Sequence, residues 1–188
     1  MTQLLICLFV RHPDDTKDAA VRTAYGNLAS LVGMACNLLL CLGKLAAGTL
    51  FGSIAIMADA LNNLSDASSN VVSLIGFKLA AKAPDAEHPY GHARYEYLAG
   101  LVVSVTILAI GFSLLKESVV KVLHPTQVVF SWLTVGILVV SILVKLWMSG
   151  FNRTVGRKIG SETLMATAAD SRNDVLTTGA VLLSTVLC

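Results

Sequence analysis

Two short stretches of the chain place pairs of oxygen-bearing side chains four residues apart within apolar sequence. Asn62 and Asp66 lie in ADALNNLSD, and Asp170 and Asp174 lie in TAADSRNDVL. Side chains with this spacing share one face of a helix. Two helices that each present such a pair could bring four oxygen donors to one point. Oxygen donors of this kind suit a hard divalent cation.

The surrounding composition is that of a membrane protein. Of 188 residues, 55% are hydrophobic and 14% are charged, with a mean hydropathy of +0.71, whereas soluble domains carry about 25% charged residues. A charge at mid-bilayer costs about 2.5–3.5 kcal/mol on insertion scales. The four aspartates at positions 59, 66, 170 and 174 together cost on the order of 10 kcal/mol unless water, a proton, a partner charge or a metal compensates. Such residues indicate an ion or substrate pathway.

A structural interpretation of the aspartates stays open. Asp170 or Asp174 could pair with Arg172 inside the same helix. Arg172 lies two residues from each of them, however, so it points to a different face and cannot easily neutralise both. The spacing therefore favours an ion site over a purely structural ion pair.

Asp59 lies on the same stripe as Asn62 and Asp66. We expect it to serve helix packing, or to support the ion ligands, rather than to bind an ion directly. Pairing with either intramembrane lysine, Lys44 or Lys145, is an alternative.

Five apolar segments reach the length of about 20 residues that a membrane-spanning helix needs. They predict an all-α membrane protein, a transmembrane helix bundle, with spans at about 25–50, 53–80, 97–122, 128–150 and 162–187. Residues 1–22 are expected to form a cytoplasmic or interfacial segment with a short amphipathic surface helix. Residues 23–188 form the transmembrane domain. Because the last span ends with the chain, we expect a further segment to follow.

Lysine and arginine are distributed unevenly between the two sides of this bundle. On one side of the predicted membrane there are at most two basic residues, Lys116 and Lys121. By the positive-inside rule, the N-terminus and the two longer polar loops are cytoplasmic. The basic residues of that side are Arg11, Lys17, Arg22, Lys78, Lys82, Arg94, Arg153, Arg157 and Lys158.

Several function classes are disfavoured by the sequence. The four cysteines have no metal-ligand spacing, and no basic patch with interleaved aromatics predicts nucleic-acid binding. No Gly-rich phosphate loop, nucleophile elbow or HExxH motif is present, so an enzyme is not expected.

Three motifs in order, GSIAIMADALNNLSD, DAEHPYGHARYE and TAADSRNDVLTTGA, resemble the cation diffusion facilitators, from about residue 20 to the end. The resemblance implies a six-span exporter of divalent metals with a cytoplasmic N-terminus, working as a homodimer in exchange for protons. It implies a bacterial-type plasma membrane location and no prosthetic group, because the metal is the substrate. It also implies that the sixth span and a cytoplasmic metal-binding domain are missing after the fifth helix.

By position, the resemblance places the transport site on Asn62, Asp66, Asp170 and Asp174. Zinc-transporting members typically carry His or Asp at the first position and His at the third. Imidazole suits zinc, whereas carboxylate and amide oxygens suit harder ions, so the site favours Mn²⁺ and resembles the manganese-exporting branch. Zinc or iron(II) export stays an alternative, because zinc binds more tightly than manganese in the Irving–Williams order. A non-transporting membrane scaffold or metal sensor is the other alternative.

The polar loop carries a second candidate metal site. Asp85, His88 and His92 have the spacing D-x2-H-x3-H, which resembles a peripheral site of some family members and offers zinc ligands. Alternatively, these histidines cap the third helix or contact lipid headgroups. Arg94 matches a basic residue that, in the family, pairs with an acid near the C-terminal part.

Overall fold

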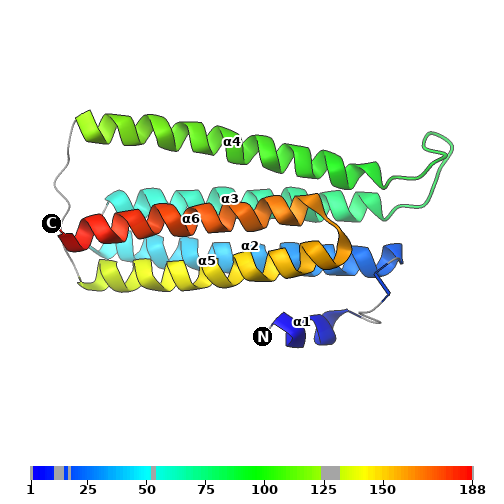
Figure 1. The fold of residues 1–188 in the computed structure, drawn as a ribbon, viewed down its shortest axis with the longest axis horizontal. Coiled ribbons are helices and arrows are strands. Elements are labelled where there is room, and N and C mark those ends of the chain that lie inside the picture. Colours follow the sequence, from blue (N-terminus) through cyan, green and yellow to red (C-terminus); the bar gives the residue numbers. More distant parts are fainter. Residues whose placement is uncertain (1, 11–14, 17, 52–53, 124–131, 188) are drawn as a thin grey trace.

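The protein is described by a computed structural model that covers residues 2–10, 15–16, 18–51, 54–123 and 132–187 (Figure 1). All regular elements in these ranges are helices, which confirms the predicted all-helical fold. Five long helices lie roughly along one axis, and α1 lies beside them at one end (Figure 1). The helices are α1 (Thr2–Phe9), α2 (Ala19–Phe51), α3 (Ile54–Ala80), α4 (Arg94–Leu123), α5 (Trp132–Ile159) and α6 (Glu162–Leu187).

Three helices of the described ranges are long and apolar enough to cross a membrane. The qualifying segments are Ala19–Leu50, Arg94–Ser113 and Trp132–Ile159. α3 and α6 are 27 and 26 residues long, which suffices for a bilayer, but they carry the polar pairs that lower their hydropathy. The count of five spans is therefore supported for three helices and stays a prediction for α3 and α6.

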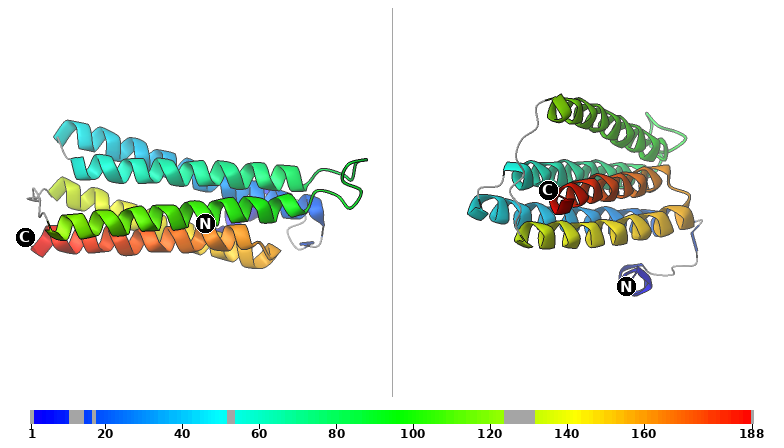
Figure 2. Two further views of the ribbon diagram at one scale, coloured as in Figure 1. Left: turned by 90° about the horizontal axis from the view of Figure 1, so that it is seen from above. Right: turned by 60° about the vertical axis from the view of Figure 1, so that its left-hand side comes forward.

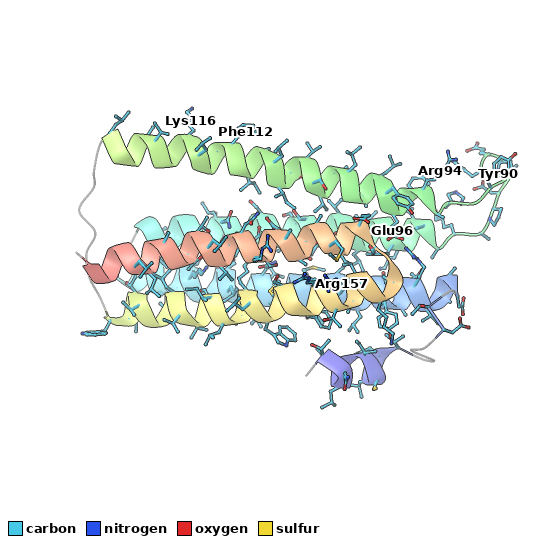
Figure 3. The ribbon with its side chains drawn as sticks, in the orientation of Figure 1. Tyr90, Arg94, Glu96, Phe112, Lys116 and Arg157 are labelled. Atoms are coloured by element: carbon cyan, nitrogen blue, oxygen red, sulfur yellow. The ribbon has the colours of Figure 1, made fainter. Side chains whose placement is uncertain are left out.

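Large apolar side chains cover the outer surface of the bundle. A soluble protein rarely exposes so continuous an apolar surface, and the pattern is that of helices in lipid. α4 lies to one side of the other four long helices (Figure 2) and exposes much of its length. Exposed examples are Leu39, Leu42, Leu101, Val105, Leu108, Phe112 and Leu143; Phe112 points away from the bundle (Figure 3).

The structure corrects the predicted boundary between the last two spans. The stretch NRTVGRKIGSE reads as a connecting loop, but α5 continues through it to Ile159. Phe151, Val155 and Ile159 recur every fourth residue and are buried in the apolar core, while the basic residues among them are exposed. The polar residues therefore mark the exposed face of a helix rather than a loop.

A two-residue turn then joins α5 to α6. Gly160 has a φ of +62°, and the Ser161 N–H donates to the Gly156 carbonyl at 2.9 Å. This is the Schellman ending, in which glycine takes the left-handed position without steric cost. Ser161 also begins α6, because its Oγ accepts from the Leu164 N–H at 3.5 Å. The short turn fixes α6 beside α5.

Helix α1 packs on the start of α2. Ile6 and Val10 join the core cluster with Val21 and Tyr25, while Leu4 remains 73% exposed. An apolar face is thus left outside the bundle. The predicted surface position of α1 on a membrane stays a prediction.

Arg22 joins three helices at the end of the bundle that carries the 81–93 loop. Its Nη2 donates to Glu96 Oε2 at 2.8 Å, and its Nη1 donates to the Ile159 carbonyl. Thr163 Oγ1 adds a hydrogen bond of 3.0 Å to the Glu96 carbonyl. Glu96 is buried, with 9% of its surface exposed, so its carboxylate depends on Arg22.

We expect Arg22→Gln to lower the free energy of unfolding by about 1–3 kcal/mol, because it leaves the Glu96 carboxylate buried without its charged partner. Thermal unfolding in detergent micelles measures the effect. Arg153→Gln, at an exposed position of α5, is the control and should leave the Tm unchanged. Equal unfolding temperatures for the two variants would contradict a clamping role for Arg22.

Candidate metal centre

Three carboxylates from two helices meet inside the bundle. Asp66 belongs to α3, and Asp170 and Asp174 belong to α6. One oxygen of each lies within 4.8 Å of the others. Asp66 is buried and the two aspartates of α6 are partly buried, whereas Arg172 is exposed. The structure therefore brings together the three acids that the four-residue spacing selects.

Asn62 completes the predicted set of four. Its Nδ2 donates to Asp174 Oδ1 at 3.3 Å, so the amide lies at the edge of the carboxylate cluster. An amide presents a carbonyl oxygen on its other side. Rotation of the Asn62 amide about its last bond would aim that oxygen at a cation held by the carboxylates.

Lys145 of α5 is the member of the cluster that sequence reasoning did not place there. Its Nζ donates to Asp66 Oδ2 at 2.5 Å and to Asp174 Oδ2 at 2.6 Å. The lysine is 3% exposed. The position of Lys145 in an apolar helix does predict an acidic partner, because a buried lysine is rarely left unpaired. The sequence does not indicate which acid that partner is.

Asp59 pairs with the other buried lysine. Lys44 Nζ of α2 lies 2.8 Å from Asp59 Oδ2 of α3. Asp59 is seven residues from Asp66, or about 10 Å along a helix. This contact is the alternative pairing of Asp59 with an intramembrane lysine, and the expected role of Asp59 in helix packing or in support of the ion ligands stays a prediction.

Close packing of the helices depends on small residues. A Cβ on Gly33 of α2 would lie 2.6 Å from Asn70 Oδ1 of α3. A Cβ on Gly76 of α3 would lie 2.2 Å from the Cβ of Ala99 of α4. The absent side chains let α3, which carries Asp66, approach both α2 and α4 closely.

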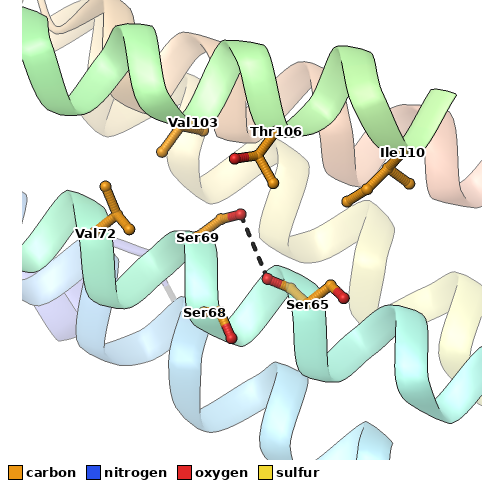
Figure 4. A pocket seen from close by; sticks show the side chains of 7 residues that line it. All are labelled: Ser65, Ser68, Ser69, Val72, Val103, Thr106 and Ile110. Carbon is orange, nitrogen blue, oxygen red and sulfur yellow. Dashed lines mark hydrogen bonds between the residues drawn. The ribbon is translucent and has the colours of Figure 1, made fainter. Parts of the chain in front are cut away.

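A cavity of about 250 Å³ lies between α3 and α4 (Figure 4). Serines and a threonine line it, but Ser69 Oγ donates to the Ser65 carbonyl at 3.4 Å and Thr106 Oγ1 to the Val102 carbonyl at 2.8 Å. Because these hydroxyls bond to their own helices, they offer the cavity no grouped ligands. The lining residues are Ser65, Ser68, Ser69, Val72, Val103, Thr106 and Ile110.

The loop before α4 brings Asp85, His88 and His92 together. One ligand atom of each lies within 4.8 Å of the others. The His88 backbone N–H donates to Asp85 Oδ1 at 2.7 Å, and His92 Nε2 lies 3.4 Å from Asp85 Oδ2. The hydrogen bond from the His88 backbone, with smaller contributions from the two imidazoles, lowers the pKa of the Asp85 carboxyl below its usual value. The three predicted loop residues thus form one cluster.

Arg94 begins α4 beside this loop and is exposed (Figure 3). The acid that the resemblance assigns to it would lie outside the described residues, so its pairing stays a prediction. Glu96, the acid two residues after Arg94, forms its ion pair with Arg22.

Comparison with known proteins identifies relatives over most of the chain. An uncharacterized transporter of Methanocaldococcus jannaschii is 32% identical over 85% of this chain and 56% of the relative. The manganese efflux system protein MneS of Bacillus subtilis is 35% identical over 79% and 51%. The cation-efflux pump FieF of Salmonella arizonae is 28% identical over 85% and 54%.

The chain spans about half the length of the curated relatives that it matches. The family model of the cation efflux transmembrane domain matches residues 30–188. That region contains the whole carboxylate cluster and the loop cluster. The chain therefore belongs to the cation efflux family, as its resemblance to the cation diffusion facilitators implies.

Proposed function

We propose that this protein exports divalent metal cations from the cytoplasm through a site formed by Asn62, Asp66, Asp170 and Asp174. The observation that carries the proposal is the convergence of three carboxylates from α3 and α6 inside a bundle with an apolar outer surface. Membership in the cation efflux family supports it. Charges placed inside a bilayer are costly, and they persist where an ion must pass.

Manganese is the proposed substrate. All four proposed ligands offer oxygen, and the cluster contains neither imidazole nor thiolate. Oxygen ligands suit Mn²⁺, whereas nitrogen and sulfur favour zinc. The likeness to a manganese efflux protein agrees with this choice. Zinc and iron(II) are the competing substrates within the same mechanism.

The proposed mechanism is alternating access coupled to protons. The bundle spans the membrane five times through α2–α6, with the N-terminus and the 81–93 loop in the cytoplasm. Arg94 and Lys116 lie at opposite ends of α4 (Figure 3), and the more basic end is the cytoplasmic one. We also propose that the protein works as a homodimer and that it lies in a bacterial-type plasma membrane.

Metal and proton compete for the same carboxylate oxygens. In the cytoplasm-facing state, the ionised aspartates bind the cation. After α3 and α6 tilt to open the site outward, protonation weakens the bonds to the metal and releases it. The inward proton gradient then drives export.

Competition between metals tests the substrate choice. The protein is reconstituted in liposomes, and uptake of Mn²⁺ is measured in the presence of Fe²⁺ or Zn²⁺. We expect Mn²⁺ to be carried in preference when each metal is supplied at the same free concentration. Preferred zinc uptake under those conditions would shift the proposal to zinc export.

A structural role for the acids is the second candidate function. The observation that favours it is the Lys145 ammonium, which already contacts two of the three carboxylates. A non-transporting scaffold of this kind would neither bind nor move metals. Titration of the purified protein with Mn²⁺ by calorimetry separates the two functions.

The loop cluster is proposed as a peripheral zinc site that transport does not require. We expect the double substitution His88→Ala and His92→Ala to remove one equivalent of bound zinc, because two of its three ligands are lost. Uptake of Mn²⁺ into liposomes should stay at the wild-type rate. Unchanged zinc stoichiometry would show that the loop holds no metal and that its histidines serve the loop conformation.

A further inference from the structure

Lys145 gives the candidate metal centre a cation of its own. The ammonium lies between α3 and α6, 2.5 Å from an oxygen of Asp66 and 2.6 Å from an oxygen of Asp174. It is 3% exposed. The oxygens that it contacts belong to two of the proposed metal ligands. A divalent ion cannot bind both oxygens while the ammonium stays on them, because the two cations would repel at contact distance.

The charges explain why a lysine belongs there at all. Three carboxylates around one divalent ion leave a net charge of −1, and an adjacent ammonium brings the loaded site to zero. An uncompensated charge is costly inside a bilayer. A lysine that stays near the site after leaving the two oxygens therefore leaves the loaded site without net charge, while its positive charge makes the ion bind less tightly than it would to three unopposed carboxylates.

The structure also contains a place for the displaced ammonium. Ser141 lies one turn before Lys145 on α5, on the same face. Its hydroxyl is buried and has no hydrogen-bond partner within the described residues. Long side chains of a helix point back over the preceding turn, and the flexible lysine stem allows the ammonium to move there.

We propose that Lys145 is a tethered competitor of the transported ion, and this inference rests on the proposed function. Without a bound ion, its ammonium holds Asp66 and Asp174 together. When a divalent ion enters, the ammonium leaves their oxygens and moves to the Ser141 hydroxyl. When the ion departs, the ammonium returns and prevents rebinding. Lys145 thus acts as a positioning residue that weakens binding and speeds release.

Lys145→Met tests this role, because methionine keeps the apolar stem and removes the charge. The dissociation constant for Mn²⁺, measured by calorimetry on the purified protein, should fall by at least about tenfold, since close buried charge pairs couple by more than that factor. In liposomes, the variant should have a lower KM and a lower maximal rate, because a tightly held ion leaves slowly. Unchanged or weaker Mn²⁺ binding by this variant would overturn the proposal.

Ser141→Ala provides an independent test that leaves the Lys145 contacts in place. Loss of the acceptor for the displaced ammonium should weaken Mn²⁺ binding by about three- to tenfold, in the range expected for a hydrogen bond to a charged group. This direction is opposite to that of Lys145→Met. Equal affinity for wild-type and Ser141→Ala would overturn the proposed path of the ammonium, even if Lys145→Met failed to fold.

Lys44→Met is the matched control, because it also removes a buried lysine and its ion pair, here with Asp59. It should leave the Mn²⁺ dissociation constant unchanged; a tenfold tighter value would show that loss of any buried lysine suffices. Measurements on the wild-type protein distinguish failure of the proposed role of Lys145 from failure of the proposed function. Wild-type transport of Mn²⁺ with unaltered affinity in Lys145→Met rejects the tethered competitor alone. Absence of Mn²⁺ binding by the wild-type protein rejects the proposed function itself.

Discussion

Replacing Asp66 or Asp174 with Ala is expected to abolish manganese flux. Each substitution removes one of the three carboxylates that lie within 4.8 Å of one another. The remaining acids cannot surround a divalent ion. The loss of uptake should exceed about 100-fold, since even the outer partners of metal ligands contribute 10–100-fold. Uptake of Mn²⁺ into liposomes, with the protein amount verified by immunoblot, measures the effect.

Loss of flux in these variants needs a control for folding. Asp66→Ala takes one of two carboxylates from Lys145, but the ammonium keeps its contact with Asp174 at 2.6 Å, so the variant should remain folded. The variant Asp66→Asn removes the charge and keeps the shape of the side chain, so it should retain the thermal stability of the wild-type protein and still lack flux. Unchanged manganese transport by Asp66→Ala and Asp174→Ala would defeat the assignment of the site.

Replacing Asn62 with His is expected to move the preference of the site toward zinc. The Asn62 side chain already lies 3.3 Å from Asp174, so an imidazole at this position reaches the cluster. Imidazole nitrogen suits zinc better than an amide oxygen does. The ratio of zinc to manganese uptake should rise on the order of tenfold, equivalent to 1.4 kcal/mol. Uptake of the two metals from an equimolar mixture gives the ratio directly.

Asn62→Gln is the matched control, because it keeps the amide and changes only its reach. It should weaken uptake of both metals and leave their ratio near the wild-type value. A variant with His at position 62 that keeps the wild-type metal ranking would show that ligand chemistry at this position does not set selectivity.

The sequence predicted the parts of the molecule that local spacing determines. The all-helical fold follows from apolar length, and the common face of Asp170 and Asp174 follows from their four-residue spacing. The meeting of α3 with α6 was predicted because two helices that each present a pair of oxygen donors could surround one divalent cation. In the structure these carboxylates do lie together.

Features that depend on how the helices face one another could not be predicted from the sequence. Whether Lys145 meets Asp59 or Asp66 depends on the rotation and register of α5 against α3, which hydropathy does not encode. The structure assigns Lys44 to Asp59 and Lys145 to Asp66 and Asp174. The extension of α5 to Ile159 was missed for a related reason, because an amphipathic helix outside the apolar zone has the composition of a loop.

Metal-driven proton flux tests the central claim most directly. The protein is reconstituted in liposomes that contain a pH-sensitive dye, and Mn²⁺, Fe²⁺ or Zn²⁺ is added outside. A site in which Asp66, Asp170 and Asp174 exchange metal for protons predicts outward proton movement as the metal enters, largest for Mn²⁺ and absent in Asp170→Ala. Tight liposomes in which none of the three metals moves protons would contradict the account.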